Sequence, residues 1–336
     1  MAYMPLWSSR KALLKLVSRC SVPRTIRKPS ALQFAALLYL TVPLFLFFFY
    51  FTRPIISVPA VLIILLVVYR ARPERMLGVD LSTREVLLCA TISCLFLCAC
   101  GYVPPLGRSW DWIKHFAIIN ELADHPWPPV NDEPHTFLRY YLGYYLVPAL
   151  FSRAFGSEFI DAFVFVETWL GLFLILGLLL QKIRPRLPVA FLACFLLFSG
   201  LDLIGWMLFG KGSSLLVHKE WWSGPDYAYE GNGTLFLWVP QHAIVGMLGI
   251  LFLLPDGEEL PPQETIGLFG VATALWSPFV TLGLLPFVLS ALSWRATLFD
   301  WSNLLCAMIL GIPVLAYLLA GIGGIPIEAA IAHRHL

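Results

Sequence analysis

The stretch from Asp111 to His125 carries the side chains best suited to chemistry. Its apolar residues recur at the period of a helix, which predicts an amphipathic helix lying in the membrane interface. Asp111 follows an apolar stretch by only a few residues, so its carboxylate should lie near the bilayer surface and could meet a lipid head group. The plainer interpretation, a solvated face of a surface helix, is the one that the spacing alone favours. The side predicted to face lipid contains Trp112, Phe116, Ile119 and Ala123, and the side roughly opposite contains Asp111, Lys114, His115, Glu121 and His125.

A tyrosine-rich segment follows at a second membrane boundary. Tyr140, Tyr141, Tyr144 and Tyr145 come directly after Arg139. Tyrosines at such a boundary often form only an aromatic belt. A flat ring with a hydroxyl can equally wall a sugar or head-group site, and both interpretations stay open.

Acidic residues also interrupt two apolar stretches. Asp202 lies in one of them and Glu167 in the other. An acid inside a membrane is costly and usually faces a cavity or a partner. For Asp202, a functional role and a structural role are about equally supported, and Glu167 is a weaker case of the same kind.

Two later apolar stretches are interrupted by proline. Pro240 should bend its helix beside Gln241 and His242, and Pro278 interrupts the next stretch in the same way. Two interrupted spans in a bundle often frame a site, although a satisfied kink explains the pattern as well. The polar loop before them holds Lys219, which could bind a phosphate as a point charge or be an ordinary surface lysine.

The composition places all these residues in a membrane protein. Of the 336 residues, 59% are hydrophobic and only 13% are charged, whereas soluble chains carry about 25% charged residues. Because open backbone is not satisfied in lipid, we expect an all-α, polytopic transmembrane bundle of eight or nine spans with an interfacial helix in its first large outer loop. The net charge of +2 gives no field that would attract nucleic acid. The seven Cys are interpreted as apolar fillers, and no metal-ligand motif is present.

Gaps between charged residues mark the candidate spans, since a helical span needs about 20 apolar residues. Tyr140–Ser152 is uncharged but only half a span long. The full candidates are Pro29–Thr52, Pro54–Tyr69, Val86–Gly107, Ala162–Gln181, Leu187–Gly210, Gly231–Pro255, Thr265–Trp294 and Trp301–Ile327.

Basic residues predict the orientation of the chain. Residues 1–28 hold seven Lys or Arg and no acid, so this tail is expected in the cytoplasm. Residues 29–84 should form a transmembrane hairpin with a second basic loop on the same side, and residues 85–336 the membrane core with outer loops 106–139 and 211–230. If Tyr140–Ser152 crosses the membrane, the basic run 182–186 lies outside. If it is re-entrant, which we favour slightly, that run is cytoplasmic.

Four stretches resemble the GT-C superfamily, membrane glycosyltransferases that use polyprenyl-phosphate-linked sugars, and in particular its uncharacterised bacterial members. They are Asp111-Trp-Ile-Lys-His115, residues 140–148, residues 199–202 and residues 238–242. The resemblance implies that Asp111 is the general base for the acceptor hydroxyl. It implies that Lys219, Arg139 or His242 stabilises the leaving phosphate. The substrate-binding residues expected from the resemblance and the interrupted spans are His115, Arg139, Tyr140, Tyr141, Asp202, Lys219, Gln241 and His242.

The chain departs from the family pattern in two ways. The loop that carries Asp111 follows the third predicted span, whereas in the family the catalytic loop usually follows the first. Some relatives use a divalent metal, for which Asp111 with Asp132 or Glu133 could supply oxygen ligands, but no strict acidic pair follows the span directly.

Three functions therefore stand as expectations. The first is a glycosyltransferase-like protein of the cell envelope, in the bacterial plasma membrane, that transfers a sugar from a polyprenyl-phosphate donor to an extracytoplasmic acceptor. The second is a transporter or flippase of a lipid-linked substrate, which would use Asp202, Glu167 and the interrupted spans. The third is a non-catalytic subunit of a membrane complex. A cavity that contains Asp111 and opens toward lipid would favour the enzyme.

Overall fold

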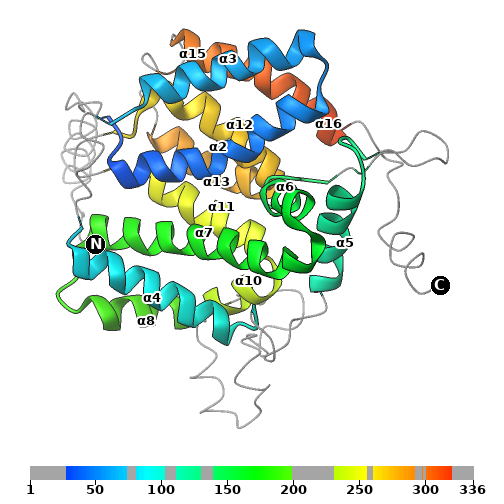
Figure 1. The fold of residues 1–336 in the computed structure, drawn as a ribbon. Helices are drawn as coiled ribbons and strands as arrows, with labels where there is room; N and C mark the ends of the chain where they lie inside the picture. The colour runs from blue at the N-terminus through cyan, green and yellow to red at the C-terminus, as the bar shows by residue number, and fades with distance from the viewer. Residues whose placement is uncertain are drawn as a thin grey trace, which may run out of the picture.

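A computed structural model describes residues 28–73, 81–102, 111–129, 138, 140–198, 231–255, 260–291, 297 and 300–319. These parts are helical (Figure 1). Three stretches are long and apolar enough to cross a membrane: Ala31–Phe51, Ser157–Ile183 and Trp301–Leu319. The helical class and the membrane character agree with the sequence, whereas the count of eight or nine spans stays a prediction.

The helices lie side by side in Figure 1, and α5 runs across one end of the others. The α-helices are α2 (Ala31–Phe51), α3 (Pro54–Arg70), α4 (Thr83–Ala99), α5 (Asp111–Asp124), α6 (Leu146–Phe155), α7 (Ile160–Ile183), α8 (Pro188–Leu197), α10 (Asn232–Trp238), α11 (Pro240–Leu253), α12 (Ile266–Trp276), α13 (Pro278–Ala291), α15 (Trp301–Leu305) and α16 (Ile312–Leu319). Short 3-10 turns cover Ser157–Phe159 and Gln263–Thr265, and a π-helical stretch, Cys306–Gly311, joins α15 to α16.

Helix α6 turns back without crossing the bundle. Its 10 residues extend about 15 Å, which is half of a bilayer core of about 30 Å. Helix α7 then runs to the end where α2 begins, since Ser30 Oγ donates a hydrogen bond to Gln181 Oε1 at 3.1 Å. Lys182 Nζ bonds the carbonyl of Leu254 at 2.9 Å, so α11 ends there too. This arrangement is compatible with the re-entrant alternative for residues 140–152, which stays a prediction.

The structure replaces the single predicted span Thr265–Trp294 with a hairpin. The chain turns at Ser277, whose backbone is extended before Pro278, and a proline at a first helical position favours a new start. Gln263 Nε2, just before α12, donates to the carbonyl of Ala291 at the end of α13 at 3.0 Å. The two helices are therefore antiparallel. A similar break at Val239 divides the predicted span Gly231–Pro255 into α10 and α11.

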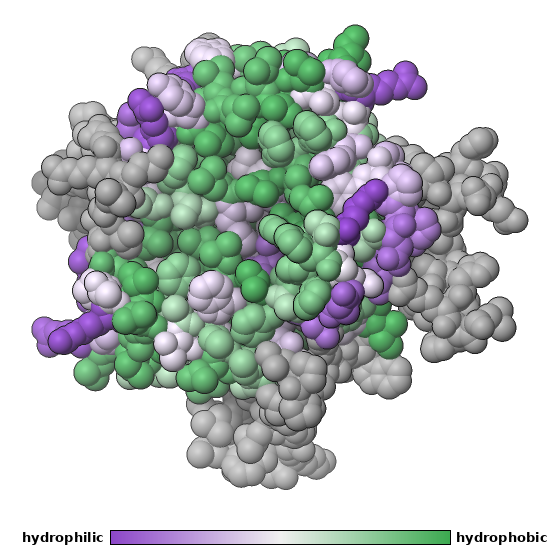
Figure 2. Space-filling view, in the orientation of Figure 1, coloured by the Kyte–Doolittle hydropathy of each residue, from purple (hydrophilic) through white to green (hydrophobic). Residues whose placement is uncertain are grey.

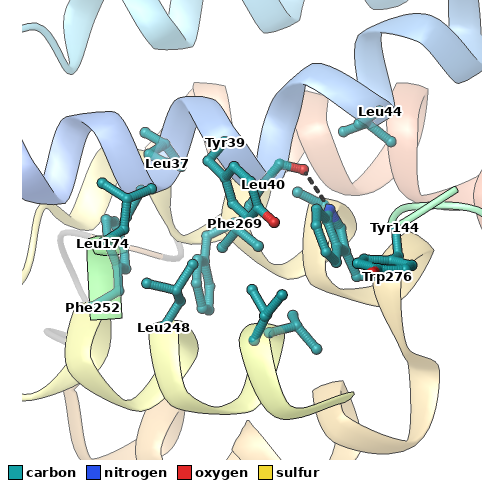
Figure 3. Packing of buried hydrophobic residues seen from close by; sticks show 14 of the residues in the cluster. Leu37, Tyr39, Leu40, Leu44, Tyr144, Leu174, Leu248, Phe252, Phe269 and Trp276 are labelled. Carbon is teal, nitrogen blue, oxygen red and sulfur yellow. Dashed lines mark hydrogen bonds between the residues drawn. The ribbon is translucent and has the colours of Figure 1, made fainter. Parts of the chain in front are cut away.

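The tip of this hairpin lies in the middle of the buried core. Trp276 is fully buried, and its Nε1 donates to the carbonyl of Leu40 at 3.1 Å (Figure 3). Leu40 is the tenth residue of the 21 in α2, so the tip reaches about half the length of that helix. The rings of Tyr39 and Tyr144 pack around Trp276, with centroids 5.1 and 6.2 Å away.

Apolar side chains cover much of the outer surface between the two ends of the bundle. Figure 2 shows hydrophobic residues over the centre of this face and hydrophilic residues mostly toward its two sides. On α13, Phe279 and Leu282 are 74% and 68% exposed. Such a surface suits contact with lipid chains and not with water.

Candidate functional site

Six of the predicted site residues lie in the described part of the chain: Asp111, His115, Tyr140, Tyr141, Gln241 and His242. The others lie outside the described residues: Arg139, Asp202, Lys219 and the candidate metal ligands Asp132 and Glu133.

Helix α5 forms over the predicted residues, but its buried face differs from the prediction. Trp112, Ile119 and Ala123, which were predicted to face lipid, are buried inside the protein. His115 was placed on the polar side, yet it is 0% exposed. The buried face packs against the protein, chiefly α6, and not against lipid. The position of His115 is explained by the end of α10.

Side chains from α5 and its surroundings satisfy the last carbonyls of α10. The final carbonyls of a helix have no partner within the helix. Here Tyr102 Oη donates to Phe236 O at 2.8 Å, Trp112 Nε1 to Leu237 O at 2.9 Å, and His115 Nε2 to Trp238 O at 3.0 Å. His115 points inward because the last carbonyl of α10 accepts its N–H. A helical wheel of α5 alone contains no information about that carbonyl.

The environment of His115 fixes its protonation. Burial lowers the pKa of this imidazole to about 4, so the ring is neutral near pH 7. Because Nε2 carries the hydrogen that Trp238 O accepts, Nδ1 is the acceptor. Tyr145 Oη lies 2.8 Å from Nδ1 and therefore donates to it. Tyr145 is fully buried, so this pair fixes the tyrosine segment beneath α5.

A second hydrogen-bonded chain joins the tyrosine segment to both proline breaks. Tyr140 Oη donates to Tyr141 Oη in a short contact. Tyr141 Oη lies 3.2 Å from His242 Nε2, and His242 Nδ1 lies 2.8 Å from Ser277 Oγ. Burial, followed by the contact with Tyr141, raises the pKa of Tyr140 above its usual value. Tyr140, Tyr141 and His242, each predicted separately, are thus brought together, with Ser277 as an unpredicted member.

The N-terminal ends of two parallel helices, α11 and α13, meet where this row of hydrogen bonds ends at His242 and Ser277. His242 stands in the first turn of α11, and Ser277 directly precedes α13. A Cβ placed on Gly246 would lie 3.5 Å from Val280, and a Cβ on Gly249 would contact Leu284, so the helices run in the same direction. Helix starts carry partial positive charge and exposed N–H groups, which attract anions.

Two charged residues of α5 act on the same groups. The Lys114 charge acts on both His115 and His242, and the Asp111 carboxylate acts on His115 and Tyr140. Asp111 is only partly buried at the start of α5. The acid and the amine are therefore close enough to the hydrogen-bonded tyrosines and histidines to act on them electrostatically.

An apolar groove of about 580 Å³ opens between α8, α10 and α11. His242 is one of its few polar lining residues, with Asn232. Asn232 Nδ2 donates to Phe195 O at 2.6 Å. Asp111 is not among the lining residues, so this groove is not the expected cavity that contains Asp111 and opens toward lipid. The apolar lining residues are Phe191, Cys194, Phe195, Phe198, Leu235, Ala243, Gly246, Met247 and Ile250.

Gln241 does not join this site through any hydrogen bond within the described residues. Its side chain is 0% exposed, and neither its Oε1 nor its Nε2 has a partner there. Tyr144 and Tyr145, which sequence reasoning placed only in an aromatic belt or a wall, are fully buried. The density of tyrosines was the signal that could have identified them. Ser277 had a signal too, since a serine before Pro278 is placed to cap the next helix.

Comparisons with known proteins give no relative to set beside this geometry. No protein-family model matches the chain, nor does any curated protein or any solved structure. The function is therefore argued from the site itself.

Proposed function

We propose that this chain is a membrane glycosyltransferase-like protein that transfers a sugar from a polyprenyl-phosphate-linked donor to an acceptor outside the cytoplasm. One observation carries the proposal: the starts of α11 and α13 meet at His242 and Ser277, beside an apolar groove and near α5. A lipid-linked phosphate has a long apolar chain, which suits the groove, and an anionic head, which suits the helix starts. The sugar and its acceptor rest on the GT-C resemblance of residues 111–115 and 140–148.

The apolar groove and the helix starts would bind different parts of the donor. Its hydrocarbon chain would lie along α8, α10 and α11, where the groove lining is apolar. Its phosphate would lie at His242, whose neighbours include the hydroxyls of Tyr141 and Ser277. Lys114 adds a positive charge that acts on His242. Hydrogen-bond donors placed where charge develops are an effective way to stabilise a leaving phosphate.

Asp111 would act as the general base. Its carboxylate takes the proton of the acceptor hydroxyl while the hydroxyl oxygen bonds to the anomeric carbon. The bond from that carbon to the phosphate oxygen breaks, and the electron pair leaves with the lipid phosphate. The partly exposed position of Asp111 near Tyr140 supports access by an acceptor from the aqueous side.

The proposal includes the cellular setting expected from the sequence. The 1–28 tail would lie in the cytoplasm of a bacterium and Asp111 on the outer side of its plasma membrane, with other membrane subunits as further partners. A divalent metal would require ligands from Asp132 or Glu133, which lie outside the described residues. No group of three or more His, Cys, Asp or Glu that could hold a metal occurs within the described residues.

The test compares two carboxylates at opposite ends of α5. Asp111→Asn should reduce consumption of polyprenyl-phosphate-linked sugar in membranes by about 10²–10⁴-fold, the usual contribution of a general base. Asp124→Asn, at the far end of the same helix, should leave turnover close to that of the unmodified chain. Unchanged turnover in Asp111→Asn would remove the catalytic role of this residue.

A transporter or flippase of a lipid-linked anion is the second candidate, and the depth of the site favours it. Discontinuous helices whose starts meet near mid-membrane often bind the anionic group of a transported substrate. Here Trp276, next to Ser277, reaches the middle of α2. Reconstituted vesicles would separate the two functions. Transport would depend on His242 and Ser277 and would survive Asp111→Asn, whereas sugar transfer would not.

A further inference from the structure

A second polar cluster lies inside the bundle and takes no part in the proposed transfer. Glu167 on α7 is 6% exposed, and its Oε1 has no hydrogen-bond partner among the described residues. Gln241 on α11 is fully buried, with both amide atoms equally without a partner there. Buried polar groups are nearly always bonded, so three such atoms require an explanation.

The helix register places these two residues on neighbouring turns of α7 and α11. Helices α7 and α11 run in the same direction, because their far ends are joined by the Lys182 bond described above. A Cβ on Gly171 would lie 3.0 Å from the side chain of Ile244, so these positions are in contact. Glu167 precedes Gly171 by four residues, and Gln241 precedes Ile244 by three. Each therefore lies one turn back on the same helix face.

No cationic group of the described residues compensates the Glu167 carboxylate. Tyr39 Oη, from α2, donates to the Glu167 backbone carbonyl at 3.0 Å. Thr168, beside Glu167, is bonded to Tyr144 at 2.6 Å. His242, the next residue on α11 after Gln241, is directed to Tyr141 and Ser277 instead. None of the described ion pairs includes Glu167. The titratable group that acts on Glu167 from the elements packed around it is the phenol of Tyr39, which interacts with the Glu167 side chain as well as with its backbone carbonyl. Tyr102 and Tyr144 act in turn on Tyr39.

We propose that Glu167 is a proton-binding site inside the membrane and that it shares its proton with Gln241. A protonated carboxyl group can donate its O–H to the amide oxygen and accept an N–H from the amide nitrogen. All three atoms without partners are then used at once. An ionised carboxylate would accept the N–H but leave the amide oxygen unbonded and a charge uncompensated in an apolar interior.

This proton site is adjacent to the candidate phosphate site. Gln241 immediately precedes His242 at the start of α11, where the chain is broken at Val239. Release of the proton would remove the proposed bond between Glu167 and Gln241 and free the start of α11 to move, which would link proton binding to anion binding at His242. That linkage rests on the proposed function, whereas the proton site itself does not.

Infrared difference spectroscopy of the whole protein in lipid tests the site without any activity. The unmodified chain should show the carbonyl stretch of a protonated, hydrogen-bonded carboxylic acid at neutral pH. This band should be lost in Glu167→Gln, whose amide is an isosteric neutral substitute, and kept in Glu158→Gln, where the altered residue is exposed. Gln241→Leu should shift the band, because the hydrogen bond to the amide is removed.

Three outcomes would overturn the proposal. A spectrum without any band that depends on Glu167 would show that the carboxyl group is ionised. An unshifted band in Gln241→Leu would show that the proton is not shared with the amide. Thermal stabilisation by Na⁺ or K⁺ that is lost in Glu167→Gln would assign the pocket to a cation instead. Loss of sugar transfer or of lipid transport bears on the proposed function alone and leaves these readouts unaffected.

Discussion

The contact between Gly143 and Trp276 gives the sharpest test of the packing at the hairpin tip. A Cβ on Gly143 would lie 2.5 Å from both Cδ1 and Cγ of the Trp276 ring and 2.7 Å from its Cα. The Gly143 backbone N–H is bonded to Leu275 O at 3.0 Å, which holds the two segments together. The ring itself is fixed by its bond to Leu40 O. Neither side can move without breaking a hydrogen bond.

Gly143→Ala should therefore destabilise the protein strongly. Overpacking a core usually costs about 1–3 kcal/mol, and we expect the upper part of that range because one clash is with backbone. Gly270→Ala is the matched control, since a Cβ there meets nothing within 4 Å. A helical Gly→Ala change stabilises by up to about 1 kcal/mol. Thermal unfolding in one detergent should give a lower Tm for Gly143→Ala and an equal or higher Tm for Gly270→Ala. Equal Tm values for the two variants would refute the reasoning.

Three further predictions concern buried or capping groups. The pKa of His115 is about 4 in the folded protein and about 6.5 in the unfolded chain. Between these two pH values the unfolded state therefore binds more protons than the folded state. The contribution of His115 to the free energy of unfolding should be complete above about pH 6.5 and fall by up to about 1.4 kcal/mol per pH unit as the pH drops toward 4. In a pH series of Tm, His115→Phe should flatten this profile, and His125→Phe, at an exposed residue, should not. Tyr144→Phe should cost about 0.5–1.5 kcal/mol through its bond to Thr168, and a double-mutant cycle with Thr168→Val should show less than additive loss; full additivity would contradict the contact. Asp300→Ala should cost about 1 kcal/mol, because the Asp300 side chain caps α15, and an unchanged Tm would show that the cap is dispensable.

The sequence predicted the helical class and many helix positions, because these depend on local properties. The hairpin of α2 and α3 was expected at Arg53, where a charge and Pro54 interrupt two apolar stretches. Helix α5 was expected from its apolar period and begins at Asp111 as proposed. Pro240 and Pro278 were expected only to bend or interrupt single spans, whereas the structure begins new helices, α11 and α13, at these residues.

What the sequence did not predict depends on contacts between distant segments. The depth of His115 follows from the carbonyl of Trp238, which lies 123 residues away along the chain. The α12–α13 hairpin was read as one span, since an apolar stretch of that length fits a single crossing equally well. The hydrogen bond from Gln263 to the Ala291 carbonyl, at the open end of the hairpin, shows that the stretch turns back. The pairing of His242 with Ser277 likewise requires both proline breaks to lie at one depth.

The hairpin also determines how the rest of the chain must be threaded through the membrane. During synthesis, a continuous apolar stretch from α12 through α13 has the length that membrane insertion machinery accepts as one crossing. In the folded protein its two ends, Gln263 and Ala291, are bonded at the same end of the bundle. A crossing would invert every later segment, whereas a hairpin does not. The stretch Trp301–Leu319 consequently starts from the side on which α12 started, since Asn303 is bonded to Gln263. The number of membrane crossings before it therefore depends on one serine-proline turn.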